Sequence, residues 1–289
     1  MKKLHGTGVA LITPFTSTLD VDYTALKKLM KHSGKGADYY VVMGTTGESP
    51  TVSGEEKKKI LEFVKKNNSS KLPIVYGIGG NNTQHVIDEI KSTDLNGVDA
   101  LLSVSPYYSK PSQEGIYQHF KAVAKASPIP VMLYNIPGRT GSNISAETTL
   151  RLAAIKNIIG TKEASGNLEQ CMKIAKDMPE DFILASGDDM MTLALYSIGG
   201  KGVISVLANA YPQVFKKMKD YAFAGNFAKA KVEQFRLLDI NGLMYEEGNP
   251  NGIKQVLSLM GICESYVRLP HVSASEGLQK RIKALYQKV

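Results

Sequence analysis

The sequence has few of the residues that mark disulfide-rich, metal-binding or membrane-spanning proteins. Its 289 residues include two cysteines, Cys171 and Cys263, which are far apart and lack metal-ligand spacing. The five histidines are scattered and form no ligand set. No apolar run approaches the roughly 18 residues that a membrane-spanning helix requires. A disulfide between the two cysteines is an alternative, but buried thiols in a reducing cytoplasm fit them better.

The N-terminal residues give little support for a signal peptide. Two lysines follow Met1, but the apolar run at residues 8–12 is short and ends at Thr13-Pro14 without a small-residue cleavage site. We interpret this run as a strand and expect a cytoplasmic protein.

The net charge of +8 raises the question of a nucleic-acid partner. The lysines stand in separate groups, such as residues 57–59, 65–66 and 216–217, and no aromatic residues are interleaved with them. A base-stacking surface needs that interleaving. We therefore interpret the lysines as solvated helix faces and expect no nucleic-acid partner; a mild attraction for anionic metabolites is a by-product.

Short runs rich in β-branched residues alternate with longer amphipathic segments. Eight runs are candidate strands, at residues 8–13, 39–43, 74–76, 100–104, 131–135, 158–162, 182–186 and 202–206. Helices are predicted between them, for example at residues 25–32, 57–66, 115–126 and 148–154, and a capping box at Ser53 to Glu56 begins the second of these. Eight strand–helix units predict an α/β fold, a (β/α)₈ TIM barrel.

The strand pattern stops after Pro212. The rest of the chain is helical apart from loops at residues 247–252 and 269–270, and no low-complexity linker interrupts it. We expect a catalytic barrel over residues 1–224 and a helical C-terminal region over residues 225–289 that packs on the barrel.

Unusual polar residues follow the predicted strands, where the active sites of such barrels lie. The second strand leads into Gly44-Thr45-Thr46-Gly47-Glu48, the fourth into Ser105-Pro106-Tyr107-Tyr108, the fifth ends in Tyr134-Asn135, the sixth in Lys162-Glu163, and the seventh leads into Gly187-Asp188-Asp189. Their convergence indicates an active site.

Lys162 is the sharpest single signal. It ends the apolar run at residues 158–161, so its side chain should begin inside the barrel mouth. A buried lysine is disfavoured as an ammonium ion, and a neutral amine can attack a ketone. The alternative is a lysine that extends to solvent and pairs with Glu163.

Three further residue types suit a small carboxylate substrate. Thr45 and Thr46 offer hydroxyl groups in a glycine-flanked turn, which could also be an ordinary connection. Tyr134 could transfer a proton or be a core tyrosine. The guanidinium group of Arg139 could bind a carboxylate through two parallel hydrogen bonds, or it could form a surface ion pair.

Two other motifs give only weak evidence for a binding site. Residues 77–80 lack the spacing of a dinucleotide fingerprint. Asp188 and Asp189 have no partner motif for a metal, so we interpret them as helix-capping residues.

Together these motifs resemble the dihydrodipicolinate synthase family, within the N-acetylneuraminate lyase superfamily. The resemblance covers essentially the whole chain. The lysine and the Gly-Thr-Thr-Gly-Glu turn mark the superfamily, whereas the Pro-Gly-Arg-Thr-Gly loop at residues 137–141 and the Tyr107-Tyr108 pair are more specific to the synthase.

The resemblance implies condensation of pyruvate with L-aspartate-4-semialdehyde in the diaminopimelate route to lysine, with no cofactor and no metal. It implies that Lys162 forms the imine and that Tyr134 shuttles protons through Thr45 to Tyr108 of a neighbouring subunit. Thr45 and Thr46 would hold the pyruvate carboxylate and Arg139 that of the semialdehyde, with Gly187 and Ile204 lining the pocket. The implied assembly is a homotetramer, a dimer of dimers.

One departure concerns feedback inhibition by lysine. The positions that match the family's lysine site are Ser49, Gly54, Lys57, Asn81, His85 and Tyr107. Lys57 stands where inhibited members usually have histidine or an acid, and His85 where they often have glutamate. A fixed cation disfavours binding of another cation, so we expect weak or absent inhibition.

Two rival functions remain. A related lyase that splits a sugar acid would also use the lysine and the tyrosine, although the loop at residues 136–138 offers little polarity for a polyhydroxylated substrate. A non-catalytic barrel that binds a keto acid is the second rival, which loss of Lys162, Tyr134 or Thr45 would have indicated; all three are present.

Overall fold

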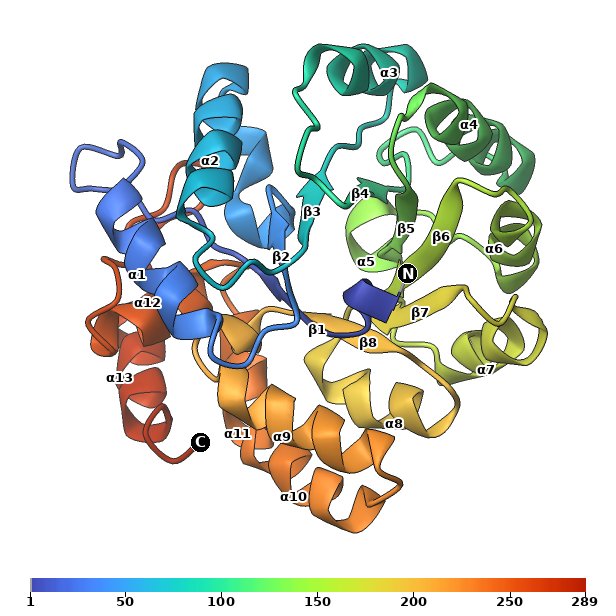
Figure 1. Cartoon of the computed structure of the whole chain (residues 1–289). Helices are drawn as coiled ribbons and strands as arrows, with labels where there is room; N and C mark the ends of the chain where they lie inside the picture. The colour runs from blue at the N-terminus through green and yellow to red at the C-terminus, as the bar shows by residue number, and fades with distance from the viewer. Residues whose placement is uncertain (1) are drawn as a thin grey trace. The chain divides into compact units, whose positions relative to one another are not determined.

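The chain folds around a closed barrel of eight parallel strands arranged in chain order, as the sequence predicts (Figure 1). The computed structural model describes residues 2–289. The strands are β1 (Gly6–Ala10), β2 (Tyr39–Val42), β3 (Ile74–Gly77), β4 (Ala100–Val104), β5 (Val131–Asn135), β6 (Ile158–Glu163), β7 (Ile183–Ser186) and β8 (Gly202–Ser205).

The strand bounds agree with the sequence pattern to within one residue except at the first strand. β4 and β5 match the predicted ranges, whereas β1 begins and ends earlier than residues 8–13. Beyond β1, the Ile12 amide donates to Asn209 Oδ1 at 3.3 Å. The Asn209 side chain therefore takes the place of a neighbouring strand as the partner of the Ile12 amide. The hydrophobic pattern of the sequence does not predict this hydrogen bond.

The helices that follow the first six strands are α2 (Gly54–Asn67), α3 (Thr83–Ser92), α4 (Gln113–Ala126), α5 (Pro137–Thr140), α6 (Ala146–Ala153) and α7 (Leu168–Asp177), with α1 (Tyr23–Ser33) after β1. After β7 comes α8 (Thr192–Ser197), and after β8 come α9 (Pro212–Phe223), α10 (Phe227–Arg236), α11 (Leu238–Asn241), α12 (Asn251–Leu259) and α13 (Glu276–Leu285). The predicted capping box between Ser53 and Glu56 is confirmed at the start of α2. The predicted loop at residues 247–252 ends early, because α12 begins at Asn251.

Two compact units make up the chain. The first contains residues up to Gly6 together with Pro73–Ile204, and the second contains Thr7–Leu72 together with Ser205–Val289.

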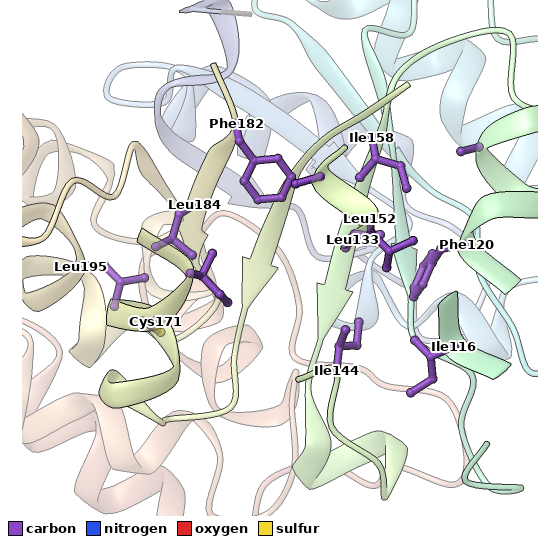
Figure 2. Close-up of a cluster of buried hydrophobic side chains, with 13 residues drawn as sticks. Ile116, Phe120, Leu133, Ile144, Leu152, Ile158, Cys171, Phe182, Leu184 and Leu195 are labelled. Atoms are coloured by element: carbon purple, nitrogen blue, oxygen red, sulfur yellow. The ribbon is translucent and has the colours of Figure 1, made fainter. Parts of the chain in front are cut away.

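The first unit has an apolar core between β5–β7 and the helices outside them. Figure 2 shows Leu133 and Ile158 on the strands, Phe120 on α4 and Leu152 on α6 directed into one cluster. These side chains are buried because the outward face of each strand meets the apolar face of an amphipathic helix. This packing holds β5, β6 and β7 against the helices outside them.

The second unit joins the N-terminal part of the chain to its last 85 residues, from Ser205 to Val289. Asn209 lies in the turn after β8, and its Nδ2 donates to the Ala10 carbonyl at 2.7 Å. Lys219 on α9 forms an ion pair with Asp38 at 2.7 Å, and Arg268 forms one with Glu56 at 2.6 Å. Residues distant in the sequence are therefore tied together by polar contacts.

Candidate active site

Lys162 lies at the C-terminal end of β6, where its side chain is almost completely buried at 6% exposure. It pairs with Tyr134 in the β5–β6 register, and its Nζ lies 4.2 Å from the centroid of the Tyr134 ring. Tyr134 is also buried, at 5% exposure. A buried amine and a buried phenol therefore lie next to each other. Nucleophilic attack by an amine with proton transfer to or from a neighbouring group requires such an arrangement.

Gly187 packs directly against the stem of Lys162. Its amide donates to the Glu163 carbonyl at 2.7 Å, which continues the pairing of β6 and β7 past their ends. A Cβ at position 187 would lie 3.0 Å from Lys162 Cε and 2.6 Å from the Cβ of Ala164. Glycine is therefore required here for close approach of the backbone to the lysine. Ile204, in β8, is buried in the same unit.

Glu163 does not pair with Lys162, so the alternative of an exposed Lys162–Glu163 ion pair is wrong. The Glu163 carboxylate accepts hydrogen bonds from Asn135 at 3.1 and 3.0 Å, from Gln170 at 3.0 Å and from the Ser165 amide at 2.8 Å. Successive side chains of a strand point to opposite faces, so this network lies on the face of β6 away from the amine. Sequence reasoning missed it, although a carboxylate next to a buried lysine was a signal.

Tyr108 lies on the loop after β4 and Arg139 lies in α5, and these two segments contact each other. The Tyr108 amide donates to the Thr140 carbonyl at 3.4 Å, which links the loop after β4 to α5. Tyr108 has a φ of 74° and is 88% exposed, and neighbouring Tyr107 is 41% exposed. Arg139 is also exposed. A non-glycine residue held at positive φ with its ring in solvent is an unusual arrangement, and it presents the phenol outward.

Thr45 and Thr46 belong to the second unit, in the short 3₁₀ turn η2 (Thr45–Gly47) that follows β2. Thr13 Oγ1 donates to the Gly47 carbonyl at 2.6 Å and holds the end of this turn. Thr46 is buried, and its hydroxyl oxygen accepts a hydrogen bond from Asn249 Nδ2 at 3.1 Å. Asn249 is a further residue that sequence reasoning missed.

A buried ion pair ends the same turn. Glu48 follows Gly47 with a φ of 54°, and its Oε1 lies 2.5 Å from Lys254 Nζ on α12. The side-chain exposures are 1% and 0%, and Lys254 also donates to the Tyr266 carbonyl at 2.7 Å. Burial lowers the pKa of Lys254, and the Glu48 carboxylate opposes that shift. The only sequence signal was a lysine within the apolar pattern of α12.

The positions matched to the family's lysine site fall in both units. Asn81 and His85 are exposed; Asn81 lies just before α3 and His85 in its first turn, and Tyr107 follows β4. Ser49, Gly54 and Lys57 lie between the Thr45–Gly47 turn and the first turns of α2.

Asp188 caps the short 3₁₀ helix at Asp189–Met191, with its carboxylate accepting from the Met190 amide at 2.8 Å. The capping prediction is thus confirmed for Asp188. Within residues 2–289, no group of three or more histidine, cysteine or acidic side chains is arranged to hold a metal ion. No helix in that part of the chain is both long and apolar enough to cross a bilayer.

Comparison with known proteins places these features in a family. Residues 3–289 match the model of the dihydrodipicolinate synthetase family. A 4-hydroxy-tetrahydrodipicolinate synthase of Cytophaga hutchinsonii is 52% identical over 290 aligned positions, which cover 100% of this chain and 98% of that one.

Solved structures agree over the same length. A monomeric dihydrodipicolinate synthase variant superposes with a TM-score of 0.96 at 34% identity, covering 99% of this chain and 97% of that one. The enzyme from Cyanidioschyzon merolae, solved with lysine bound, gives a TM-score of 0.95 at 38% identity, covering 99% and 98%. The chain therefore belongs to the dihydrodipicolinate synthetase family and is a lyase-type synthase.

Proposed function

We propose that the chain condenses pyruvate with L-aspartate-4-semialdehyde to 4-hydroxy-tetrahydrodipicolinate, in the diaminopimelate route of lysine biosynthesis. The observation that carries this proposal is the buried Lys162 amine 4.2 Å from the Tyr134 ring, with Gly187 packed on its stem. The 52% identity to a synthase of that name supports the substrates.

In the proposed reaction the Lys162 amine attacks the ketone carbon of pyruvate and water leaves, which forms an imine. Loss of a methyl proton gives an enamine, whose carbon attacks the aldehyde of the second substrate. The amine of that substrate then attacks the imine carbon, closes the ring and releases Lys162. Tyr134 would transfer the protons through Thr45 to Tyr108, and its burial beside the amine supports that role.

Two separate groups would hold the two carboxylates. The hydroxyl groups of Thr45 and Thr46 would bind that of pyruvate, as suits a turn whose backbone is held by Thr13 and Glu48. Arg139 would bind that of the semialdehyde, since its exposed guanidinium can bind a carboxylate bidentately. Gly187 and Ile204 would line the pocket.

Borohydride reduction in the presence of pyruvate tests the imine. We expect a covalent adduct on the peptide that contains Lys162, and none in a Lys162→Met variant. Lys173, which is exposed on α7 and pairs with Glu169, supplies the matched control Lys173→Met, which should be labelled like the unmodified protein. Labelling at another lysine, or none, would remove the proposal.

Substrate assays separate the synthase from a sugar-acid lyase. We expect turnover with pyruvate and the semialdehyde, and none with N-acetylneuraminate or a 2-keto-3-deoxy acid. An Arg139→Met variant should raise the KM for the semialdehyde roughly tenfold or more while pyruvate is trapped as before, because only the second substrate loses its charged partner.

We also propose a homotetramer, a dimer of dimers, in which Tyr108 reaches the active site of its neighbour. The 88% exposure of Tyr108 supports a contact outside its own chain, although one relative of the same fold is a monomeric variant. Mixing Lys162→Met chains with Tyr108→Phe chains tests this. Each hybrid dimer would regain one intact site, so activity should rise above that of either variant; no recovery would mean that Tyr108 acts in its own chain.

Lysine should inhibit weakly or not at all. The support is the cationic Lys57 and the loss of an acid at His85, against a relative from Cyanidioschyzon merolae that binds lysine. Half-inhibition at sub-millimolar lysine would contradict this. A Lys57→His/His85→Glu variant should become more sensitive than the unmodified protein, because it restores acceptors for the ammonium group.

We propose that the enzyme is cytoplasmic. We also propose that residues 225–289 form a helical region that packs on the barrel of residues 1–224. The free, buried thiols of Cys171 and Cys263 support a reducing compartment. The contacts of Lys254 and Arg268 with Glu48 and Glu56 support packing of the addition on the barrel.

A further inference from the structure

The segment before α12 contacts the Thr45–Gly47 turn through the side chain of Asn249. Asn249 is 5% exposed, and its Nδ2 donates to Thr46 Oγ1 at 3.1 Å, across 203 positions of sequence. Both residues lie in the second compact unit. The contact therefore connects the helical C-terminal region to one of the two hydroxyl groups that we propose for pyruvate.

The direction of this hydrogen bond decides what Thr46 can do. A hydroxyl group has one hydrogen to donate and lone pairs to accept. Because the Asn249 amide occupies an acceptor position of Thr46, the hydroxyl hydrogen remains to be donated to another group. A carboxylate only accepts hydrogen bonds, so a hydroxyl turned in this way suits a carboxylate ligand.

The buried ion pair holds the turn at its other end. Lys254 Nζ lies 2.5 Å from Glu48 Oε1, and the Arg268 amide donates to Glu48 Oε2 at 3.0 Å. Glu48 adopts a left-handed conformation, which costs a non-glycine residue energy unless the surroundings hold it. With Glu48 fixed on one side and Thr46 on the other, little rotation is left to the turn between them.

We propose that Asn249 is a positioning residue for the keto-acid carboxylate, acting by orienting the Thr46 hydroxyl as a donor. The proposal rests on the function proposed above, in which Thr46 binds that carboxylate. In this proposal Asn249 contacts Thr46 and not the carboxylate. Its effect on pyruvate binding therefore depends on the Thr46 hydroxyl and should disappear when that hydroxyl is removed.

A double-mutant cycle between Asn249→Ala and Thr46→Val tests it, with the pyruvate concentration for half-maximal borohydride trapping as the readout. Asn249→Ala should raise that concentration roughly three- to tenfold, because the hydroxyl is no longer held as a donor. Thr46→Val should raise it roughly tenfold or more. In the Thr46→Val background, Asn249→Ala should add less than about twofold.

An isosteric variant gives a second, independent readout. In Asn249→Asp the carboxylate would accept the Thr46 hydrogen, so the loss of pyruvate affinity should exceed that of Asn249→Ala. A residue that only packs would show the opposite order, because aspartate keeps the shape of asparagine. The turnover at saturating pyruvate should change less than about threefold in either variant, since the lysine is untouched.

Asn251 supplies the matched control. It is as buried as Asn249, at 3% exposure, and its Nδ2 donates to the carbonyls of Glu247 and Val272 rather than to the turn. Asn251→Ala should change stability without changing the pyruvate concentration for half-maximal trapping.

The two proposals fail in distinguishable ways. If the unmodified protein forms no pyruvate adduct on Lys162, the proposed function fails. If the adduct forms but Asn249→Ala and Asn249→Asp trap pyruvate at the same concentration as the unmodified protein, or if the Asn249→Ala effect persists in Thr46→Val, the positioning role is overturned.

Discussion

The side-chain amide of Asn135 donates to both carboxylate oxygens of Glu163, at 3.1 and 3.0 Å. Asn135 directly follows Tyr134 in β5, and Glu163 directly follows Lys162 in β6. The bond therefore joins the two strands immediately beyond the pair of residues that we propose for catalysis. Gln170 on α7 donates to the same carboxylate and ties both strand ends to a helix.

Replacing Glu163 with leucine should lower the free energy of unfolding by about 3 kcal/mol, because the amides of Asn135 and Gln170 would lose their buried acceptor. Urea unfolding followed by circular dichroism measures this. Glu169→Leu is the control: Glu169 is exposed on α7 and pairs with exposed Lys173, so its loss should leave the unfolding midpoint almost unchanged. Equal midpoints for the two variants would contradict the role of the network.

Because Glu48 and Lys254 form a buried ion pair, we expect the single variant Lys254→Met to lose more stability than the double variant in which Glu48 is also neutral. Lys254→Met should destabilise the protein by about 3–5 kcal/mol, because it leaves a buried carboxylate without its cation. Adding Glu48→Gln should restore roughly half of that loss, since the remaining side chain is neutral. Additive losses in urea unfolding would show that the two groups do not interact.

His119 predicts a loss of stability in mild acid. Burial lowers its pKa from 6.5 to about 4, and the side chain is 4% exposed. Between these values the unfolded chain binds a proton that the folded protein does not, so stability is complete above pH 6.5 and falls as the pH is lowered toward 4. The loss from this group should reach about 3 kcal/mol.

A His119→Gln variant tests the assignment. It can keep a hydrogen bond to Thr83, which lies 2.9 Å from His119 Nδ1, but it cannot take up the proton. Its free energy of unfolding should fall less steeply between pH 6.5 and 4 than that of the unmodified protein. Parallel curves would assign the acid sensitivity to other groups.

Gly187→Ala should impair the reaction without unfolding the protein. The new methyl group would lie 2.6 Å from the Cβ of Ala164 and 3.0 Å from Lys162 Cε, so Ala164 and the lysine must both shift. A displacement of that kind should lower kcat/KM for pyruvate by roughly a hundredfold. Gly242→Ala is the control, because a Cβ there meets nothing within 4 Å. Normal borohydride trapping in Gly187→Ala would mean that Lys162 accommodates the methyl group.

The barrel could be predicted from the sequence because its signals are local. Each strand is a short apolar run, and each helix shows its own period and cap, as at Ser53 and Glu56. The order of these elements leaves few folds to choose from. Lys162 and Tyr134 stood out for the same reason: each is a chemically distinctive residue at the end of an apolar run.

What the sequence determined by itself was therefore the order of the eight strands and the candidate catalytic residues at their ends. Only the tertiary structure decided which side chains hold those residues in place. The Glu48–Lys254 pair spans 206 positions and the Asn249–Thr46 bond spans 203. Nothing in the local pattern around a polar residue specifies so distant a partner. Such pairs form because a polar group removed from water must find a hydrogen-bond partner, and the folded chain decides which one is near.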